Sequence, residues 1–261
     1  MLPVAAENVP DEQPKGPWHR WSSIRLKVKA MPLLSGRIWM HVDPAESTTR
    51  FETESNARFL GARVASSETV SLLDNRSGQP KWHTSRSGKK ARRFTFGEKS
   101  YRYEKLRTQG DARAPLDGWE VRRSVNFDYP LDAEGKPLPV YDYYGMLLQL
   151  RRAPLKDIDD EATFHVATSE GVKPFRVRVV ELRAGTVSWR ALPESKQVRS
   201  IVQQMRLSIE PLSPGEDQEG FLNMEGETEL WVERHSKTVL RIGGKARKVP
   251  GKIALVLAEM G

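Results

Sequence analysis

Apolar and polar residues alternate along most of this chain, and the alternation limits what the chain can fold into. Between residues 23 and 30, apolar Ile24, Leu26 and Val28 alternate with arginine and lysine. Successive side chains of a β-strand point to opposite faces, so such a segment can be buried on one side and hydrated on the other. Because the pattern recurs along the chain, we expect an all-β fold built on a large curved antiparallel sheet or partial β-barrel.

Turn-forming residues divide the pattern into short segments typical of strands. Pairs such as Ser35-Gly36 and Ser87-Gly88 separate neighbouring segments and predict hairpins. A sheet of many strands must close or cover its edges, which favours a curved sheet. The expected strands are Trp21–Ala30, Arg37–Val42, Arg50–Phe59, Ser66–Leu73, Lys81–Ser85, Lys90–Phe96, Ser100–Arg107, Trp119–Asp128, Ala162–Ala167, Lys173–Leu182, Thr186–Ala191, Gln204–Leu212, Glu227–His235, Thr238–Ile242 and Ile253–Ala258.

One segment, residues 137–155, departs from the alternation and predicts a helix. Asp142 is a typical N-cap residue, apolar residues such as Leu147 follow at helical spacing, and Pro154 stands where a helix must stop. We therefore expect one main α-helix, enclosed by the sheet. A second segment, Glu194–Met205, fits either a helix or a pair of strands.

The first 17 residues contain several prolines and few bulky apolar side chains. That composition predicts a flexible lead-in before a single β-rich domain over residues 18–261. The start of the chain is typical of a mature protein whose signal peptide has been removed. No apolar segment reaches the roughly 20 residues of a membrane-spanning helix, so we expect no transmembrane segment.

Several kinds of chemistry find no support in the sequence. The chain has no cysteine, which excludes disulfides, thiolate metal sites and cysteine nucleophiles. Its five histidines show no local metal-ligand spacing, and no serine-nucleophile motif or phosphate-binding loop is present. The acidic group Asp157, Asp159, Asp160 and Glu161 lacks the spacing of a calcium loop and predicts a solvated turn. We expect no catalytic residue, metal or cofactor.

Basic residues gather on one predicted hairpin and form a candidate basic surface, consisting of Arg86, Lys89, Lys90, Arg92 and Arg93. Aromatic residues follow between positions 94 and 103, and basic residues interleaved with aromatics can bind envelope anions or single-stranded nucleic acid. The alternative is a solvated hairpin whose aromatic side chains lie in the core. The net charge is +8, but most basic residues alternate with apolar ones, so we do not expect nucleic acid as a partner.

Aromatic residues on the second face of the strands indicate that this face is shielded from water. Trp39 lies between Ile38 and Met40 in the sequence, so it faces away from them. Such a face is covered by the helix or lines an apolar cavity for a lipid, with core packing as the alternative. The candidate ligand-binding residues are Trp39, Tyr101, Tyr103, Arg151 and Trp231.

The order of several motifs resembles the exported bacterial proteins grouped as domain of unknown function 3108. The motifs are MPLLSGRIWMHV, the segment from SSETVSLLDNRSG to FGEKSYRYEK, the helix VYDYYGMLLQLRRAPL and the closing ELWVERHSKTVLRIGG. In the helix, the resembling positions are Asp142, Leu147, Leu150, Arg151, Pro154 and Leu155. The resemblance covers residues 20–260 and implies export to the periplasm or cell envelope, with no catalytic residues to carry over.

These observations favour a non-enzymatic periplasmic or cell-envelope protein that binds a lipid or other amphiphile inside a β-shell. One alternative is an interaction or scaffold module that binds an envelope protein through the basic surface. Another is an enzyme acting on envelope glycans, which needs two carboxylates across a groove. The strand-borne candidates for that role are Glu52, Glu54, Glu68 and Glu104.

Overall fold

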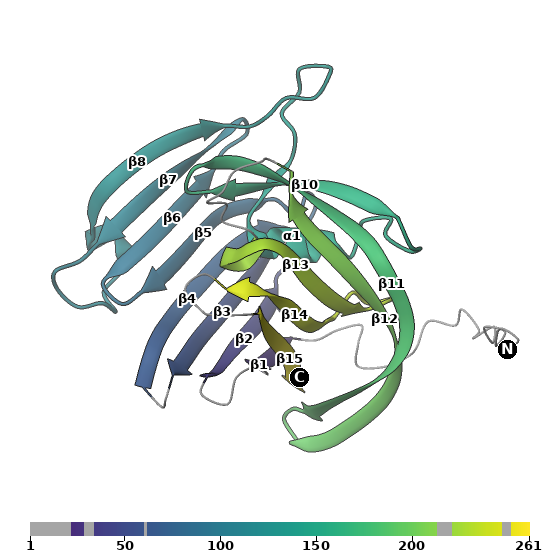
Figure 1. Cartoon of the computed structure of the whole chain (residues 1–261). Coiled ribbons are helices and arrows are strands. Elements are labelled where there is room, and N and C mark those ends of the chain that lie inside the picture. The colour runs from purple at the N-terminus through teal and green to yellow at the C-terminus, as the bar shows by residue number, and fades with distance from the viewer. Residues whose placement is uncertain (1–21, 29–33, 60–61, 213–220, 247–251) are drawn as a thin grey trace, which may run out of the picture.

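The computed structural model describes residues 22–28, 34–59, 62–212, 221–246 and 252–261, which form one sheet of fifteen strands and one α-helix (Figure 1). The N-terminal strands are β1 (Ser23–Val28), β2 (Leu34–Pro44), β3 (Thr48–Phe59), β4 (Ala62–Asp74), β5 (Pro80–Ser87), β6 (Lys90–Phe96), β7 (Ser100–Arg107) and β8 (Glu120–Asp128). The C-terminal strands are β9 (Val140–Tyr141), β10 (Glu161–Thr168), β11 (Gly171–Ala191), β12 (Lys196–Pro211), β13 (Met224–Glu233), β14 (Val239–Ala246) and β15 (Lys252–Met260). The helices are α1 (Tyr143–Gln149) and two short 3-10 helices, η2 (Leu116–Gly118) and η3 (Phe221–Asn223).

Neighbouring strands in the chain are neighbours in the sheet, apart from one junction. The order runs from β8 down to β1, then continues from β15 down to β9. β1 therefore joins the two halves of the sheet, because it pairs with β2 on one side and β15 on the other. Both halves curve toward α1, which lies between them (Figure 1).

The C-terminal half curls until it meets itself. The end of β11 pairs with the end of β15 in parallel, with Arg190 opposite Glu259 and Ala191 opposite Met260. Strands β11 to β15 thereby form a closed ring, which leaves these strands without a free edge. The expected all-β fold, a large curved sheet around one main helix, is confirmed.

Several details of the predicted elements need correction. Ser35-Gly36, predicted as a turn, lies within β2, where both residues pair with β3. The predicted strands Lys173–Leu182 and Thr186–Ala191 are one strand, β11, because its pairing with β12 continues through residues 182–186. At Gly185 the end of the Gln204 side chain lies against the backbone, 2.5 Å from where a Cβ would stand. The segment Glu194–Met205 holds the turn and start of β12, so the strand alternative is the right one.

The helix is shorter than the segment that predicted it. It begins directly after Asp142, as predicted, but ends at Gln149, well before Pro154. The lead-in of residues 1–17 and the predicted loop at residues 213–220 lie outside the described residues.

In β1 the alternating pattern predicts the burial correctly, whereas β8 is exposed along most of its length. In β1, Ile24 and Leu26 are fully buried, while Lys27 is exposed. One core cluster extends across both halves of the sheet and α1, through residues such as Leu26, Phe175 and Met146. A second cluster lies on β6, β7 and β10 around Phe94, Tyr101, Tyr103, Tyr129, Val140 and Ala167. None of the helices in the described part of the chain is long and apolar enough to span a membrane.

Because β1 is the junction between the halves, its core side chains should matter for the whole sheet. We expect Leu26→Ala to lower the free energy of unfolding by about 2–5 kcal/mol, since it leaves a cavity at a fully buried position. Urea unfolding followed by circular dichroism measures this change. Lys27→Ala, on the exposed face of the same strand, is the control and should change stability by less than about 0.5 kcal/mol. Equal effects of the two variants would contradict the assignment of faces.

Candidate functional site

A buried hydrogen-bond network fixes the start of α1. Asp142 is 3% exposed, and its Oδ1 accepts a hydrogen bond from the backbone N–H of Gly145 at 2.6 Å, as an N-cap does. Its Oδ2 accepts from the Ser71 hydroxyl at 2.5 Å and lies 2.9 Å from Nδ1 of His83. Burial alone would raise the pKa of Asp142, but the hydrogen bonds and the charge of His83 outweigh it and lower that pKa.

The contact of a serine, a histidine and an aspartate resembles a catalytic triad, but the geometry of the three side chains differs from that of a triad. A triad needs the two ring nitrogens to serve different partners, one the carboxylate and the other the serine. Here His83 Nδ1 faces both Ser71 Oγ, at 2.8 Å, and Asp142 Oδ2. Because the serine proton is donated to Asp142, the hydroxyl is not activated by the histidine. The group is a structural anchor for α1, not a nucleophile.

Two tyrosines in the first turn of α1 connect the helix to opposite halves of the sheet. Tyr144 stacks on Phe51 at 4.9 Å between ring centroids, and its hydroxyl lies 3.0 Å from Thr53 Oγ1. Tyr143 packs edge-on against Phe221, at 5.4 Å, and Phe175, at 6.3 Å. The helix is therefore held between the two halves by its first turn.

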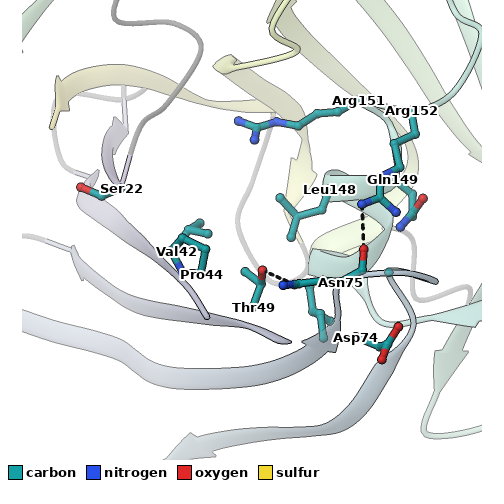
Figure 2. A pocket seen from close by; sticks show the side chains of 12 residues that line it. Ser22, Val42, Pro44, Thr49, Asp74, Asn75, Leu148, Gln149, Arg151 and Arg152 are labelled. Carbon is teal, nitrogen blue, oxygen red and sulfur yellow. Dashed lines mark hydrogen bonds between the residues drawn. The ribbon is translucent and has the colours of Figure 1, made fainter. Parts of the chain in front are cut away.

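A cavity of about 390 Å³ lies at the opposite, C-terminal end of α1, which we call the apolar cavity (Figure 2). Its apolar lining consists of Val42 and Pro44 from β2, Leu73 from β4 and Leu148 from α1. Leu148 extends from the helix toward the side where Val42 and Pro44 lie (Figure 2). The volume is within the range of small-molecule sites.

Polar side chains form one side of the apolar cavity. Arg152 donates hydrogen bonds to the backbone oxygens of Asn75 and Arg76, and Asn75 in turn accepts from the Thr49 hydroxyl at 2.7 Å. Arg151 also lines the cavity, and Figure 2 shows its side chain extending over the cavity from beyond Leu148. Arg151 is exposed as a whole residue, yet nearby protein desolvates its guanidinium enough to lower the pKa of Arg151.

Among the five candidate ligand-binding residues, Arg151 lines the apolar cavity and the other four do not. Tyr101 is buried in the second core cluster, where its hydroxyl donates to the Thr168 carbonyl at 2.8 Å, and Tyr103 packs in the same cluster. Trp39 stacks on His41 on the sheet face opposite the buried Met40. Trp231 is covered by the Arg183 guanidinium, 4.0 Å above its ring.

The five residues of the candidate basic surface do not form one continuous surface. Arg86 donates to the carbonyls of Ala112 and Ala114, and Lys89 donates to that of Gln109, so both bind the loop that follows β7. Arg93 bonds to Glu104 at 2.7 Å and Asp117 at 2.8 Å. Lys90 and Arg92 are exposed, and strand alternation places them on the face opposite Arg93.

The candidate carboxylates show no pair suited to glycoside hydrolysis. Glu52 pairs with Arg50 at 2.6 Å, and Glu104 with Arg93. Glu54 and Glu68 lie opposite each other on β3 and β4 and line one open hollow of about 260 Å³, but both are exposed. A general acid of a glycosidase needs surroundings that keep it protonated, and an exposed strand face does not supply them. Within the described residues, no three His, Asp or Glu side chains gather where they could hold a metal ion.

One buried lysine was not identified from the sequence. Lys237, in the turn between β13 and β14, donates to the carbonyls of Leu155 at 2.8 Å and Arg234 at 2.7 Å. It thereby joins this turn to the segment that follows α1. Desolvation lowers the pKa of Lys237 to about 8.

We expect Asp142→Ala to lower the free energy of unfolding by about 3 kcal/mol, because it removes the N-cap and leaves buried His83 and Ser71 without their acceptor. The folded-state pKa of Asp142 lies below its unfolded value, so this contribution is present above about pH 4 and is lost as the pH falls. Urea unfolding from pH 7 to pH 2.5 should show the difference between wild type and variant shrinking below pH 4. Asp128→Asn, at an exposed position of β8, is the matched control and should have little effect at any pH.

Lys237 should produce an opposite pH dependence. Because its pKa is about 8 when folded and about 10.4 when unfolded, only the unfolded chain binds this proton between those values, so stability rises with pH. Lys237→Met should reduce the slope of the free energy of unfolding against pH, between pH 8 and 10, by the equivalent of up to one bound proton. Exposed Lys252→Met should leave the slope unchanged. A variant slope equal to that of the wild type would show that Lys237 is not desolvated.

Comparisons with known proteins define the fold and leave the family open. No family model matches the chain, and no curated protein matches its sequence. A β-barrel-like protein from Brucella abortus, with a domain of unknown function called DUF1849, has a similar solved structure. The two are 12% identical with a TM-score of 0.51, and the match covers 91% of this chain and 95% of that one. At this identity the similarity shows a β-barrel-like fold alone, and the resemblance to domain of unknown function 3108 stays a prediction.

Proposed function

We propose that this protein is a non-enzymatic binding protein of the bacterial periplasm or cell envelope, and that it holds a hydrophobic or amphiphilic ligand in the apolar cavity. The observation that carries the proposal is the cavity itself, about 390 Å³ between β2, β4 and the C-terminal end of α1. Its apolar side chains would gain from contact with a hydrocarbon chain by the hydrophobic effect.

Arg151 favours an amphiphile with an anionic head over a neutral hydrocarbon. The guanidinium lines the same cavity as Leu148, so a ligand with its chain on Leu148 can place its head near Arg151. Desolvation disfavours the charged form of this side chain, and an anionic group nearby would offset that cost. A carboxylate or phosphate head could form two parallel hydrogen bonds to the guanidinium.

The envelope location is part of the same proposal and is supported by the resemblance of the motif order to domain of unknown function 3108. The interaction module is less well supported, because Arg86, Lys89 and Arg93 already bind groups of this chain. The glycan-acting enzyme is also less well supported, because Glu54 and Glu68 lie on an exposed face.

The cavity can be tested by filling it. Leu148→Trp should weaken binding of dodecanoic acid by about tenfold or more, a loss of roughly 1.4 kcal/mol, because the larger side chain occupies the ligand's space. Isothermal titration calorimetry measures the affinity. Leu131→Trp, at a 60% exposed position away from the cavity, is the control and should bind as the wild type does. In addition, mass spectrometry of protein purified from bacterial periplasm should detect a bound lipid.

A matched pair of ligands tests the role of Arg151 separately from that of the apolar side chains. Arg151→Gln should weaken the binding of dodecanoic acid but leave the affinity for dodecanol unchanged, because the two ligands differ only in the charged head. If neither ligand binds the wild-type protein and no lipid copurifies, the proposed function is wrong. If both ligands bind and Arg151→Gln weakens them equally, the cavity is correct and the anionic preference is wrong.

A further inference from the structure

The strand register of the N-terminal half gathers basic residues from three strands on one face of the sheet. Lys90 on β6 lies directly opposite Arg107 on β7, and Lys105 on β7 lies directly opposite Arg123 on β8. Opposed residues share a face, and Lys105 and Arg107 share one because they are two residues apart on β7. We call these four side chains the cationic patch. The three strands form the outer end of this half of the sheet (Figure 1).

The charges of the cationic patch are close together and unpaired. All four residues are exposed, and within the described part of the chain none of their charged groups forms a hydrogen bond or an ion pair. Neighbouring strands lie about 5 Å apart and alternate residues of one strand about 7 Å apart, so these charges occupy an area of roughly 10 by 7 Å. Like charges directly opposite each other destabilise a sheet. An anion bound to the patch would relieve that repulsion.

Two other charged residues lie on the same face, and they do not neutralise the patch. Glu120 lies opposite Arg107, but its carboxylate pairs with Arg122 at 2.8 Å. Arg92 lies opposite Lys105 and already interacts within the protein, so it is not counted in the patch. Even if the charge of Glu120 is counted in full, the face keeps a net positive charge.

We propose that the cationic patch binds a ligand with two or more phosphate groups. Several positive charges in so small an area favour a ligand that concentrates negative charge, and a phosphate group carries up to two charges and several acceptor oxygens. Lysine binds phosphate as a point charge, and arginine binds it through two parallel hydrogen bonds. One phosphate can bridge Lys90 and Arg107, and a second can bridge Lys105 and Arg123. A soluble polyphosphate and a lipid head group with two phosphates share this chemistry.

The cationic patch is independent of the proposed function, because none of its residues lines the apolar cavity. It also differs from the basic surface that the sequence predicted, of which it retains Lys90 alone. The other three residues come from β7 and β8, and the register of these strands is what brings them next to Lys90.

Isothermal titration calorimetry of the wild-type protein with inorganic tripolyphosphate tests the proposal. We expect saturable binding that weakens as the salt concentration rises, because salt screens exposed charges. Inorganic monophosphate should bind about tenfold more weakly or worse, since it reaches one pair of cations instead of two.

A second measurement identifies the source of the phosphates. The protein is sedimented with phosphatidylcholine vesicles that contain cardiolipin, a lipid with two phosphate groups, and with vesicles of phosphatidylcholine alone. Binding that requires cardiolipin supports a lipid head group as the ligand, and binding of tripolyphosphate without cardiolipin vesicles supports a soluble one.

A matched pair of variants separates the patch from the overall positive charge of the protein. Lys105→Gln combined with Arg123→Gln should weaken tripolyphosphate binding about tenfold or more. Lys196→Gln combined with Arg199→Gln, at exposed positions of β12, removes the same charge and should have little effect. The first double variant removes a like-charge contact, so it should fold as the wild type does, which thermal unfolding checks. Leu148→Trp should bind tripolyphosphate normally, so a failure of the apolar cavity would not affect this result.

Three results would overturn the proposal. The first is that neither tripolyphosphate nor cardiolipin vesicles bind. The second is an equal affinity for monophosphate and tripolyphosphate, which would exclude a ligand with two phosphate groups. The third is equal weakening in the two double variants, which would show that the net charge of the protein, and not the patch, attracts the anion.

Discussion

The buried carboxylate of Asp142 is the constraint on which the interior of this protein depends. It caps α1, accepts from Ser71 on β4 and contacts His83 on β5, so it attaches the helix to the N-terminal half of the sheet. The cost of burying a charge is offset here because both oxygens accept hydrogen bonds. With the first turn fixed in this way, Tyr143 can pack against the C-terminal half and Tyr144 against the N-terminal half. A seven-residue helix, too short to be stable alone, is thereby held in one position.

That position divides the space inside the curved sheet into two regions of different chemistry. At the C-terminal end of α1, apolar side chains from the helix and β2 leave a cavity with arginine on one side. At the N-terminal end, His83 and Asp142 of the network that anchors the helix line a smaller hollow of about 70 Å³. Because both regions depend on the placement of one short helix, a substitution of Asp142 should alter the shape of both.

The closed C-terminal ring forms one side of this arrangement. The parallel bridges between β11 and β15 close the ring, and buried Trp189 directly precedes the bridged residues. β1 then links the ring to the more open N-terminal half. Lys237, in the turn between β13 and β14, donates a hydrogen bond to the carbonyl of Leu155 and so holds the segment after the helix. The helix is thus held by contacts from both halves and from both of its ends.

The sequence by itself determined the class of fold, because alternation and turn residues are local properties. It predicted the buried face of β1 and the start of the helix at Asp142. The lengths of the strands were harder to predict. β11 continues through Gly185 because it stays paired with β12, and no local feature of the sequence indicates this pairing. Which face of a strand meets the helix is also not local. The alternation predicts that Trp39 and Met40 point to opposite faces, but only the structure shows that the face of Met40 is the buried one.

Only the tertiary structure brought together the groups that form the candidate sites. His83 and Asp142 are 59 residues apart in the chain, and Lys237 reaches a carbonyl 82 residues away. Their proximity results from the curvature of a fifteen-stranded sheet around a helix. A sequence pattern of period two shows that each strand has two faces, but it does not show how strongly the sheet bends. The bend decides which side chains meet, and with them the chemistry of the interior.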